Sequence, residues 1–111
     1  MTVFHVALHS DWHAAIASGE YRVSTAAATI DEVGYIHAAE VQQVSGVVER
    51  FYRGQQDLVV LVIDEDAVAA DGAEIRREDV GDGQLFPHIY GAIRPHWVVG
   101  VNDLTDQAHS S

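Results

Sequence analysis

Two histidines lie in short apolar segments that would hold an ionisable ring in place. His37 occurs in "GYIHAAE" and His88 in "LFPHIYG". Histidine has an ordinary pKa close to neutral pH, so both rings are candidates for proton transfer or ligand binding. Pro87 restricts the backbone ahead of His88, and its large apolar neighbours anchor the segment by burial. We therefore predict that "FPHIYG" is a rigid loop that forms one wall of a cleft, with His37 opposite.

Three further side chains could complete such a site. Glu78 ends a predicted strand eight residues before Phe86, so it should face the same cleft, where a carboxylate can act as a base or hold a ribose hydroxyl. Tyr90 offers an aromatic face, and Arg22 in "GEYRVST" could clamp a phosphate or carboxylate. Structural alternatives exist for each. The rings could bond backbone carbonyls, Glu78 could solvate the surface, and Arg22 could form a surface ion pair of little energetic value.

A metal site is the weaker reading of the seven histidines. His5, His9 and His13 are spaced by four, which on one helix face would make ligand pairs. However, Ser10 is a good N-cap, so we expect His9 to lie outside the helix and His5 in the strand before it. A metal-dependent hydrolase using His37, His88 and Glu78 remains a third hypothesis, because spacing alone cannot bring three separate segments together. Phosphate-binding loops, HExxH and GxSxG are absent.

The elements that would position these residues follow from hydrophobic periodicity. Strands are predicted at 3–8, 35–38, 73–78 and 96–103, and a central strand at 57–64, where the apolar run is continuous. One helix is predicted from the cap Ser10 to Gly19, with Trp12, Ala15 and Ile16 buried. A second helix is predicted over 40–53, with Val41, Val44, Val48 and Phe51 on its buried face and Gly54 as its stop. Residues 25–34 should be a small-residue loop or a ragged helix.

Length and composition restrict the class of protein. The 111 residues predict one compact α+β domain over 1–103, with a frayed tail at 104–111. The net charge is −11 with six Arg and no Lys, which argues against binding to nucleic acid or to an anionic membrane. No cysteine, signal peptide or bilayer-length apolar run is present, so we expect a soluble cytoplasmic protein. The residues identify no cofactor and no oligomeric state.

Three segments together resemble a known family. They are "GEYRVST", the long block that begins "GYIHAAEVQQVSGVVERFYRG", and a glutamate eight residues before "FPHIYG". This combination resembles the small bacterial family called domain of unknown function 952, from about Trp12 to about Val101. The resemblance implies a fold similar to ADP-ribosyltransferases, with two main helices and a cleft between small sheets. In that fold the cleft holds a nicotinamide dinucleotide.

The resemblance also implies a set of site residues. The family's characteristic positions fall on Ser24, His37, Glu78, Pro87, His88 and Tyr90. One departure is Ala39, where the family commonly has serine directly ahead of the helix. If that serine were an N-cap, its loss would cost roughly 1 kcal/mol of stability. If it were instead a ligand-binding or catalytic residue, its replacement by Ala39 would impair or alter the function of this chain.

Two main functional hypotheses follow. In the first, the protein is a small-molecule enzyme or binder of the ADP-ribosyltransferase-like type. His37, His88 and Glu78 would act on a ligand held by Arg22, Ser24 and Tyr90. In the second, a non-catalytic domain of the same fold binds a metabolite or a protein partner. Turnover of a nicotinamide dinucleotide distinguishes the two.

Overall fold

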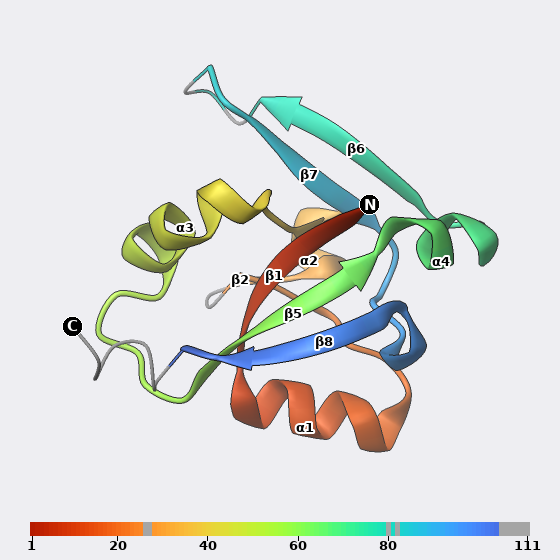
Figure 1. Ribbon diagram of the computed structural model, residues 1–111, viewed down its shortest axis with the longest axis horizontal. Coiled ribbons are helices and arrows are strands. Elements are labelled where there is room, and N and C mark those ends of the chain that lie inside the picture. The colour runs from red at the N-terminus through yellow and green to blue at the C-terminus, as the bar shows by residue number, and fades with distance from the viewer. Residues whose placement is uncertain (26–27, 80, 82, 105–111) are drawn as a thin grey trace.

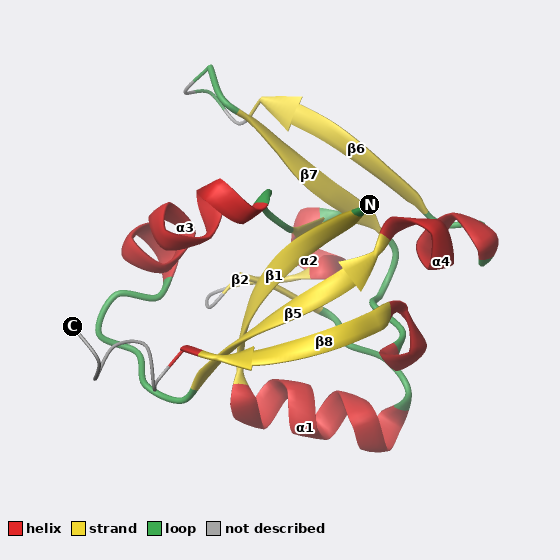
Figure 2. Ribbon diagram, viewed as in Figure 1, coloured by secondary structure: helices red, strands yellow, loops and turns green. Residues whose placement is uncertain are grey.

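The computed structural model describes residues 1–25, 28–79, 81 and 83–104, and short helices are interspersed among its strands (Figures 1 and 2). The strands are β1 (Thr2–Leu8), β2 (Val23–Thr25), β3 (Ala28–Thr29), β4 (Ile36–His37), β5 (Leu58–Asp64), β6 (Glu74–Asp79), β7 (Leu85–Tyr90) and β8 (Val98–Asp103). The helices are α1 (His9–Ser18), α2 (Ile30–Val33), α3 (Val44–Phe51) and α4 (Glu65–Ala70), with 3-10 turns at Val41–Gln43 and Pro95–Trp97. The predicted α+β class is confirmed, and α1 and α3 are the two longest of these helices.

The first sheet is built around β5, as its continuous apolar run predicts. β5 pairs antiparallel with β1 on one side and with β8 on the other. Leu61 and Ile63 are fully buried, together with Val3 of β1. Because both faces of β5 are covered, every position in the run can be apolar.

The second sheet carries both predicted histidines, in the order β4-β7-β6. The "FPHIYG" segment at 86–91 was predicted as a rigid loop, but residues 86–90 belong to the central strand β7 of this sheet, so that prediction was wrong. Proline is unusual in a central strand because it lacks an N–H donor. Here the Pro87 carbonyl still accepts from the Ala38 N–H at 2.9 Å, and the register with β6 continues through Pro87.

Helix α1 follows β1 without a loop, which corrects two expectations. It begins at His9 rather than after Ser10, and the residue at its N-cap, Leu8, makes no side-chain cap bond. Gly19 ends it in the left-handed conformation (φ 89°), as predicted. Trp12 and Ala15 are buried, but Ile16 is 55% exposed, because only a narrow stripe of this helix meets the sheet.

The predicted second helix is divided. Its first turn, Val41–Gln43, is 3-10, and α3 follows from Val44 to Phe51. Val41 is 67% exposed, contrary to prediction, while Val47 is buried. Gly54 beyond its end has a positive φ of 80°.

The remaining segments differ less from expectation. Residues 25–34, predicted as a loop or ragged helix, contribute the end of β2, then β3 and the single-turn helix α2. Of the predicted tail at 104–111, only residue 104 lies inside the described part. No helix within the described residues is both long and apolar enough to cross a membrane.

Candidate functional site

His37 and His88 are direct cross-strand neighbours. They face each other in the antiparallel register of β4 and β7, and their ring centroids lie 5.4 Å apart. The His37 N–H bonds the Ser24 hydroxyl rather than β7, so this is a pair of the non-hydrogen-bonded type, in which side chains approach most closely. The flanking Ile36 and Ile89 point the other way, into the core. The two rings therefore lie side by side on one face of the sheet, as expected of two histidines on one wall, although they do not lie on opposite sides of a cleft.

Glu78 holds the ring of His88. Its Oε1 lies 2.8 Å from His88 Nδ1, and the same oxygen accepts a hydrogen bond from the Tyr90 hydroxyl. These two donors, Tyr90 first, lower the pKa of Glu78, so the carboxylate is ionised at neutral pH. An ionised carboxylate only accepts, so Nδ1 of His88 must carry a proton. In a neutral ring this leaves the lone pair on Nε2, which is buried and has no hydrogen-bond partner among the described residues.

Tyr35 covers His88. The two rings stack at a centroid distance of 3.9 Å with 13° between their planes, and Tyr90 lies beside Tyr35 at 5.6 Å. His88 is consequently only 2% exposed. Our prediction did not include Tyr35, although a signal existed. It precedes His37 by two residues, and side chains two apart on a strand share a face.

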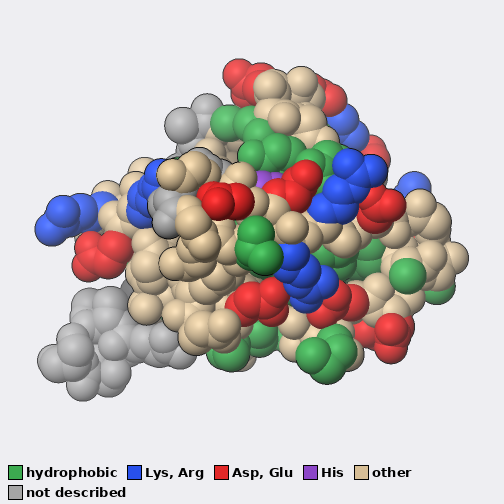
Figure 3. Space-filling view, turned by 90° about the horizontal axis from the view of Figure 1, so that it is seen from above, with side chains coloured by type: hydrophobic (Ala, Val, Ile, Leu, Met, Phe, Trp, Pro, Cys, Tyr) green, Lys and Arg blue, Asp and Glu red, His purple; other side chains and the backbone are tan. Residues whose placement is uncertain are grey.

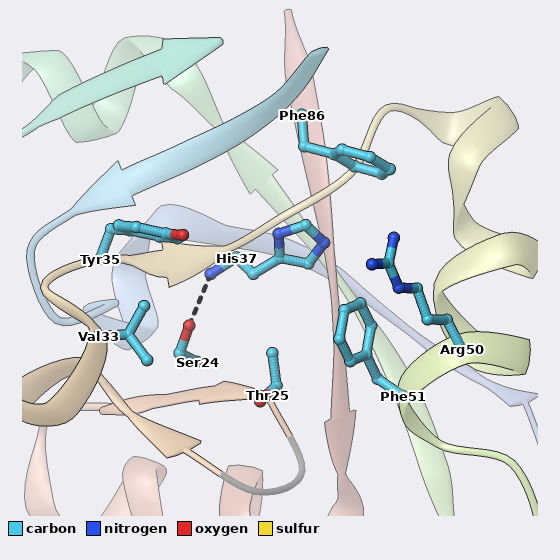
Figure 4. Close-up of a pocket in the computed structure, with 8 residues that line it drawn as sticks. All are labelled: Ser24, Thr25, Val33, Tyr35, His37, Arg50, Phe51 and Phe86. Atoms are coloured by element: carbon cyan, nitrogen blue, oxygen red, sulfur yellow. Dashed lines mark hydrogen bonds between the residues drawn. The ribbon is translucent and has the colours of Figure 1, made fainter. Parts of the chain in front are cut away.

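The ring of His37 lies in a pocket of about 190 Å³ (Figure 4). The pocket is lined by Ser24, Thr25, Val33, Tyr35, His37, Arg50, Phe51 and Phe86. Phe86 and Phe51 flank the ring at 4.9 and 5.5 Å between centroids. Of the other predicted site residues, only Ser24 shares this lining. His88 and Tyr90 lie on β7, the strand next to β4, and Glu78 lies on β6, beyond β7 in the same sheet.

Burial keeps His37 uncharged. Desolvation, followed by the neighbouring His88 and Arg50, lowers its pKa from 6.5 to about 4. Burial is the principal cause of this lowered pKa. The Nε2 atom of His37 is also buried without a hydrogen-bond partner in the described part of the chain. At neutral pH the pocket therefore contains a neutral imidazole that can donate or accept a hydrogen bond.

Side chains from other strands clamp the backbone of His37. Its N–H donates to the Ser24 hydroxyl at 3.1 Å, and its carbonyl accepts from His5 Nδ1 at 2.6 Å. That bond fixes the proton of His5 on Nδ1, so Nε2 accepts from the Tyr21 hydroxyl at 3.0 Å. His5 is fully buried, which lowers its pKa to about 4. The chain from Tyr21 through His5 thus fixes the position of His37.

The three histidines spaced by four do not gather. His9 lies inside α1 rather than before it, and its ring stacks on exposed His13 at 6.4 Å between centroids, whereas His5 is buried in β1. Within the described ranges, no group of three or more His, Asp or Glu side chains is arranged to hold a metal ion. The metal-dependent hydrolase therefore finds no support in these residues.

Arg22 does not line the pocket. Its guanidinium is exposed and pairs with Asp31 at 2.5 Å and with Glu20 at 3.6 Å. Arg50 of α3 lies at the pocket instead, and Figure 4 shows it extending towards the ring of His37. No sequence spacing could have indicated Arg50, because only the docking of α3 beside β4 brings it there.

Ala39 does not cap a helix. It is buried and forms an isolated bridge with Phe4, with N–H to O distances of 2.7 and 2.8 Å. The cap position belongs to Glu40, which forms a capping box with Gln43. The structure therefore does not support the N-cap alternative for this position.

The surface above β6 and β7 has charged side chains that pair with one another. Seen from above, basic and acidic side chains lie next to one another there (Figure 3). Arg77 bonds Glu65 at 2.8 Å and Glu40 at 3.1 Å, and Arg76 bonds Glu74. Arg76 and Arg77 are thus neutralised by neighbouring carboxylates.

Comparison with known proteins places the chain among proteins without an assigned activity. The model of a family described as "Protein of unknown function (DUF952)" matches residues 6–101. Two crystal structures of protein CC0527 from Caulobacter crescentus, one of them a double mutant, are similar to this chain. Each has a TM-score of 0.78 and 24% identity, over 93% of this chain and 85% of that one. At this identity the likeness shows the fold alone. A comparison with curated proteins gave no match.

Proposed function

The chain belongs to this DUF952 family of unknown function, and we propose that it is a small-molecule enzyme or binding protein whose ligand occupies the pocket at His37. One observation carries the proposal. Two adjacent histidines keep their Nε2 atoms buried without hydrogen-bond partners among the described residues, and one of these rings lines a pocket. Buried polar atoms are nearly always satisfied, so such atoms beside a pocket suit hydrogen bonds to a ligand.

His37 is the residue that would touch the ligand. With a pKa of about 4 it is almost entirely neutral at pH 7, so it is a weak general base. A neutral imidazole is better suited to bonding a ligand oxygen or nitrogen, or to polarising a carbonyl group. Ser24 supports it through the backbone N–H and also lines the pocket.

Glu78, His88 and Tyr90 would act through His37. The ionised carboxylate of Glu78 fixes the tautomer of His88, as a carboxylate does for a metal-bound histidine. His88 does not line the pocket, so it reaches a ligand only through His37 or after Tyr35 has moved away. We assign these three residues a positioning role, and Arg22, which lies outside the pocket, no role.

Binding without turnover is the second candidate. It is favoured by the low pKa of His37, which makes that ring a weak base, and by Tyr35, which stacks on His88 and covers it. The resemblance to ADP-ribosyltransferases makes nicotinamide dinucleotides the first ligands to test. Nucleoside phosphates and other small metabolites come next. Nucleic acid and membranes are not proposed as partners, given the net charge of −11.

The test combines binding with product analysis. Thermal shift is measured with each ligand class, since a ligand at 100 times its Kd stabilises by about 2.7 kcal/mol. Release of nicotinamide is followed by chromatography. We expect His37→Gln to abolish the shift, and His13→Gln, an exposed histidine on α1, to keep it. Saturable binding with product identifies an enzyme, and binding without product identifies a binding protein. If no ligand class produces either a thermal shift or a product, the proposal is overturned.

A further inference from the structure

We propose that His88 is a second contact for the ligand of this pocket, reached when the ring of Tyr35 rotates away, and that the ligand presents a hydroxyl group there. The inference rests on the proposed function, since it concerns the same pocket. While Tyr35 covers His88, that histidine has the positioning role assigned above. The open arrangement adds a binding subsite and the chemical group that it takes, neither of which the family description supplies.

The unpartnered nitrogen of His88 lies one layer of side chains behind the pocket. Glu78 of β6 bonds Nδ1, and β6 and β4 flank β7 on opposite sides, so the ring edge that carries Nε2 faces β4. Two rings contact His88 from the β4 side, those of His37 and Tyr35. Both of them also line the pocket. Movement of either ring would therefore open a path from the pocket to Nε2.

Tyr35 is held less firmly than His37. The backbone of His37 is bonded to side chains of β1 and β2, and its ring is flanked by Phe51 and Phe86. Tyr35 is partly exposed, and its ring is stacked on His88. Such stacking contributes only about 0.5–1.5 kcal/mol beyond the burial of area, and exposed side chains change rotamer readily. Tyr35 is therefore the ring that we expect to move.

The strand register provides a second position for the Tyr35 ring. One step further along the register of β4 and β7, Tyr35 comes opposite Tyr90. Its ring nevertheless lies over the diagonal neighbour His88, with 13° between the planes, and its centroid is 5.6 Å from that of Tyr90. Long side chains can reach both the opposite and the diagonal residue. A rotation that carries the ring towards Tyr90 would uncover His88.

The tautomer of His88 determines which chemical group can bind. Because ionised Glu78 accepts from Nδ1, a neutral His88 ring has only a lone pair on Nε2, so the ligand must donate the hydrogen bond. A carboxylate cannot do so. His37 is neutral at pH 7 and can donate as well as accept. With ring centres 5.4 Å apart, one hydroxyl group can donate to His88 and accept from His37.

Chemical modification tests whether His88 becomes accessible. Diethyl pyrocarbonate acylates unprotonated ring nitrogens, and peptide mass spectrometry follows each histidine separately. His5 is the internal control, because it is as buried as His88 but has both ring nitrogens hydrogen-bonded. Exposure of His5 needs unfolding, which costs more than rotation of one ring, so His88 should react at least on the order of tenfold faster.

Two variants of Tyr35 sharpen this test. Tyr35→Ala removes the cover and should accelerate the modification of His88 but not of His5, whereas Tyr35→Phe keeps the stacked ring and should change neither rate. If Tyr35→Ala accelerates both histidines, that variant is unfolding, and the two rates in the unaltered protein decide. Equal rates for His88 and His5 there, or no acceleration of His88 in Tyr35→Ala, would overturn the inference.

Phenol and anisole test the hydroxyl group. Both are single rings, which suits a pocket of about 190 Å³, but the methyl ether of anisole has no proton to donate. We expect phenol to shift the nitrogen NMR signals of both His37 and His88, and to bind on the order of tenfold tighter than anisole. Equal affinities, or a shift of His37 without His88, would overturn the inference and uphold the pocket. No shift of either ring by phenol or anisole would contradict both proposals.

Discussion

Two buried tyrosines should respond in opposite ways to loss of the hydroxyl group. Tyr21 donates to His5 Nε2 at 3.0 Å, whereas the Tyr52 hydroxyl is buried without a hydrogen-bond partner among the described residues. Tyr21→Phe removes a bond and leaves the His5 acceptor buried and unsatisfied, which costs about 1–3 kcal/mol. Tyr52→Phe removes only a hydroxyl that burial has desolvated, so stability should be unchanged or should rise by up to about 1 kcal/mol.

The assay is urea unfolding of the two variants beside the unaltered protein. A difference of about 2 kcal/mol between them, at an m-value of about 2 kcal/mol/M, separates their midpoints by about 1 M. The two residues are almost equally buried, so each variant is the control for the other. Equal destabilisation by both would show that loss of packing dominates, and would refute the hydrogen-bonded chain that we describe behind His37.

Three further predictions concern the site and its charges. The folded pKa of both His5 and His37 is about 4, below the ordinary 6.5, so the unfolded chain binds more protons between these values. Stability should therefore be full above pH 6.5 and fall as pH drops towards 4, by roughly 3 kcal/mol per histidine, and urea unfolding at about pH 7 and about pH 5 measures this. If stability is the same at both pH values, His5 and His37 are not buried as neutral rings. Glu78→Gln should lower the fraction of His88 protonated at Nδ1, seen in nitrogen NMR shifts, because an amide can also donate to that atom; an unchanged tautomer would remove the role given to Glu78. Arg22→Gln should leave ligand affinity unchanged, and a lost affinity measured by calorimetry would return Arg22 to the site.

Much of the framework follows from local patterns. The alternation at 3–8 and the continuous run at 57–64 predict β1 and β5 because a strand has a period of two and a central strand is covered on both faces. Gly19 marks a helix end because a residue of positive φ is needed there. Periodicity failed at Ile16, since a helix can have more apolar positions than its neighbours cover.

The site was only partly predictable. The apolar surroundings of His37 and His88 indicated burial, and pairing of β4 with β7 brings the rings together. Pro87 suggested a loop, because no local pattern reveals that a strand can keep its register through a proline whose carbonyl is still bonded. The position of Arg50 depends on how α3 packs, and packing of this kind is set by the whole core rather than by nearby residues.

The most direct test of the proposed pocket is an NMR titration of the histidine ring signals with nicotinamide dinucleotide and with nucleoside phosphates. We predict a saturable shift of the His37 signal by at least one of these ligands, while the exposed His9, His13 and His96 stay unchanged. If the exposed histidines shift as much as His37, or if His37 does not respond to any ligand, the pocket at His37 is not the functional site.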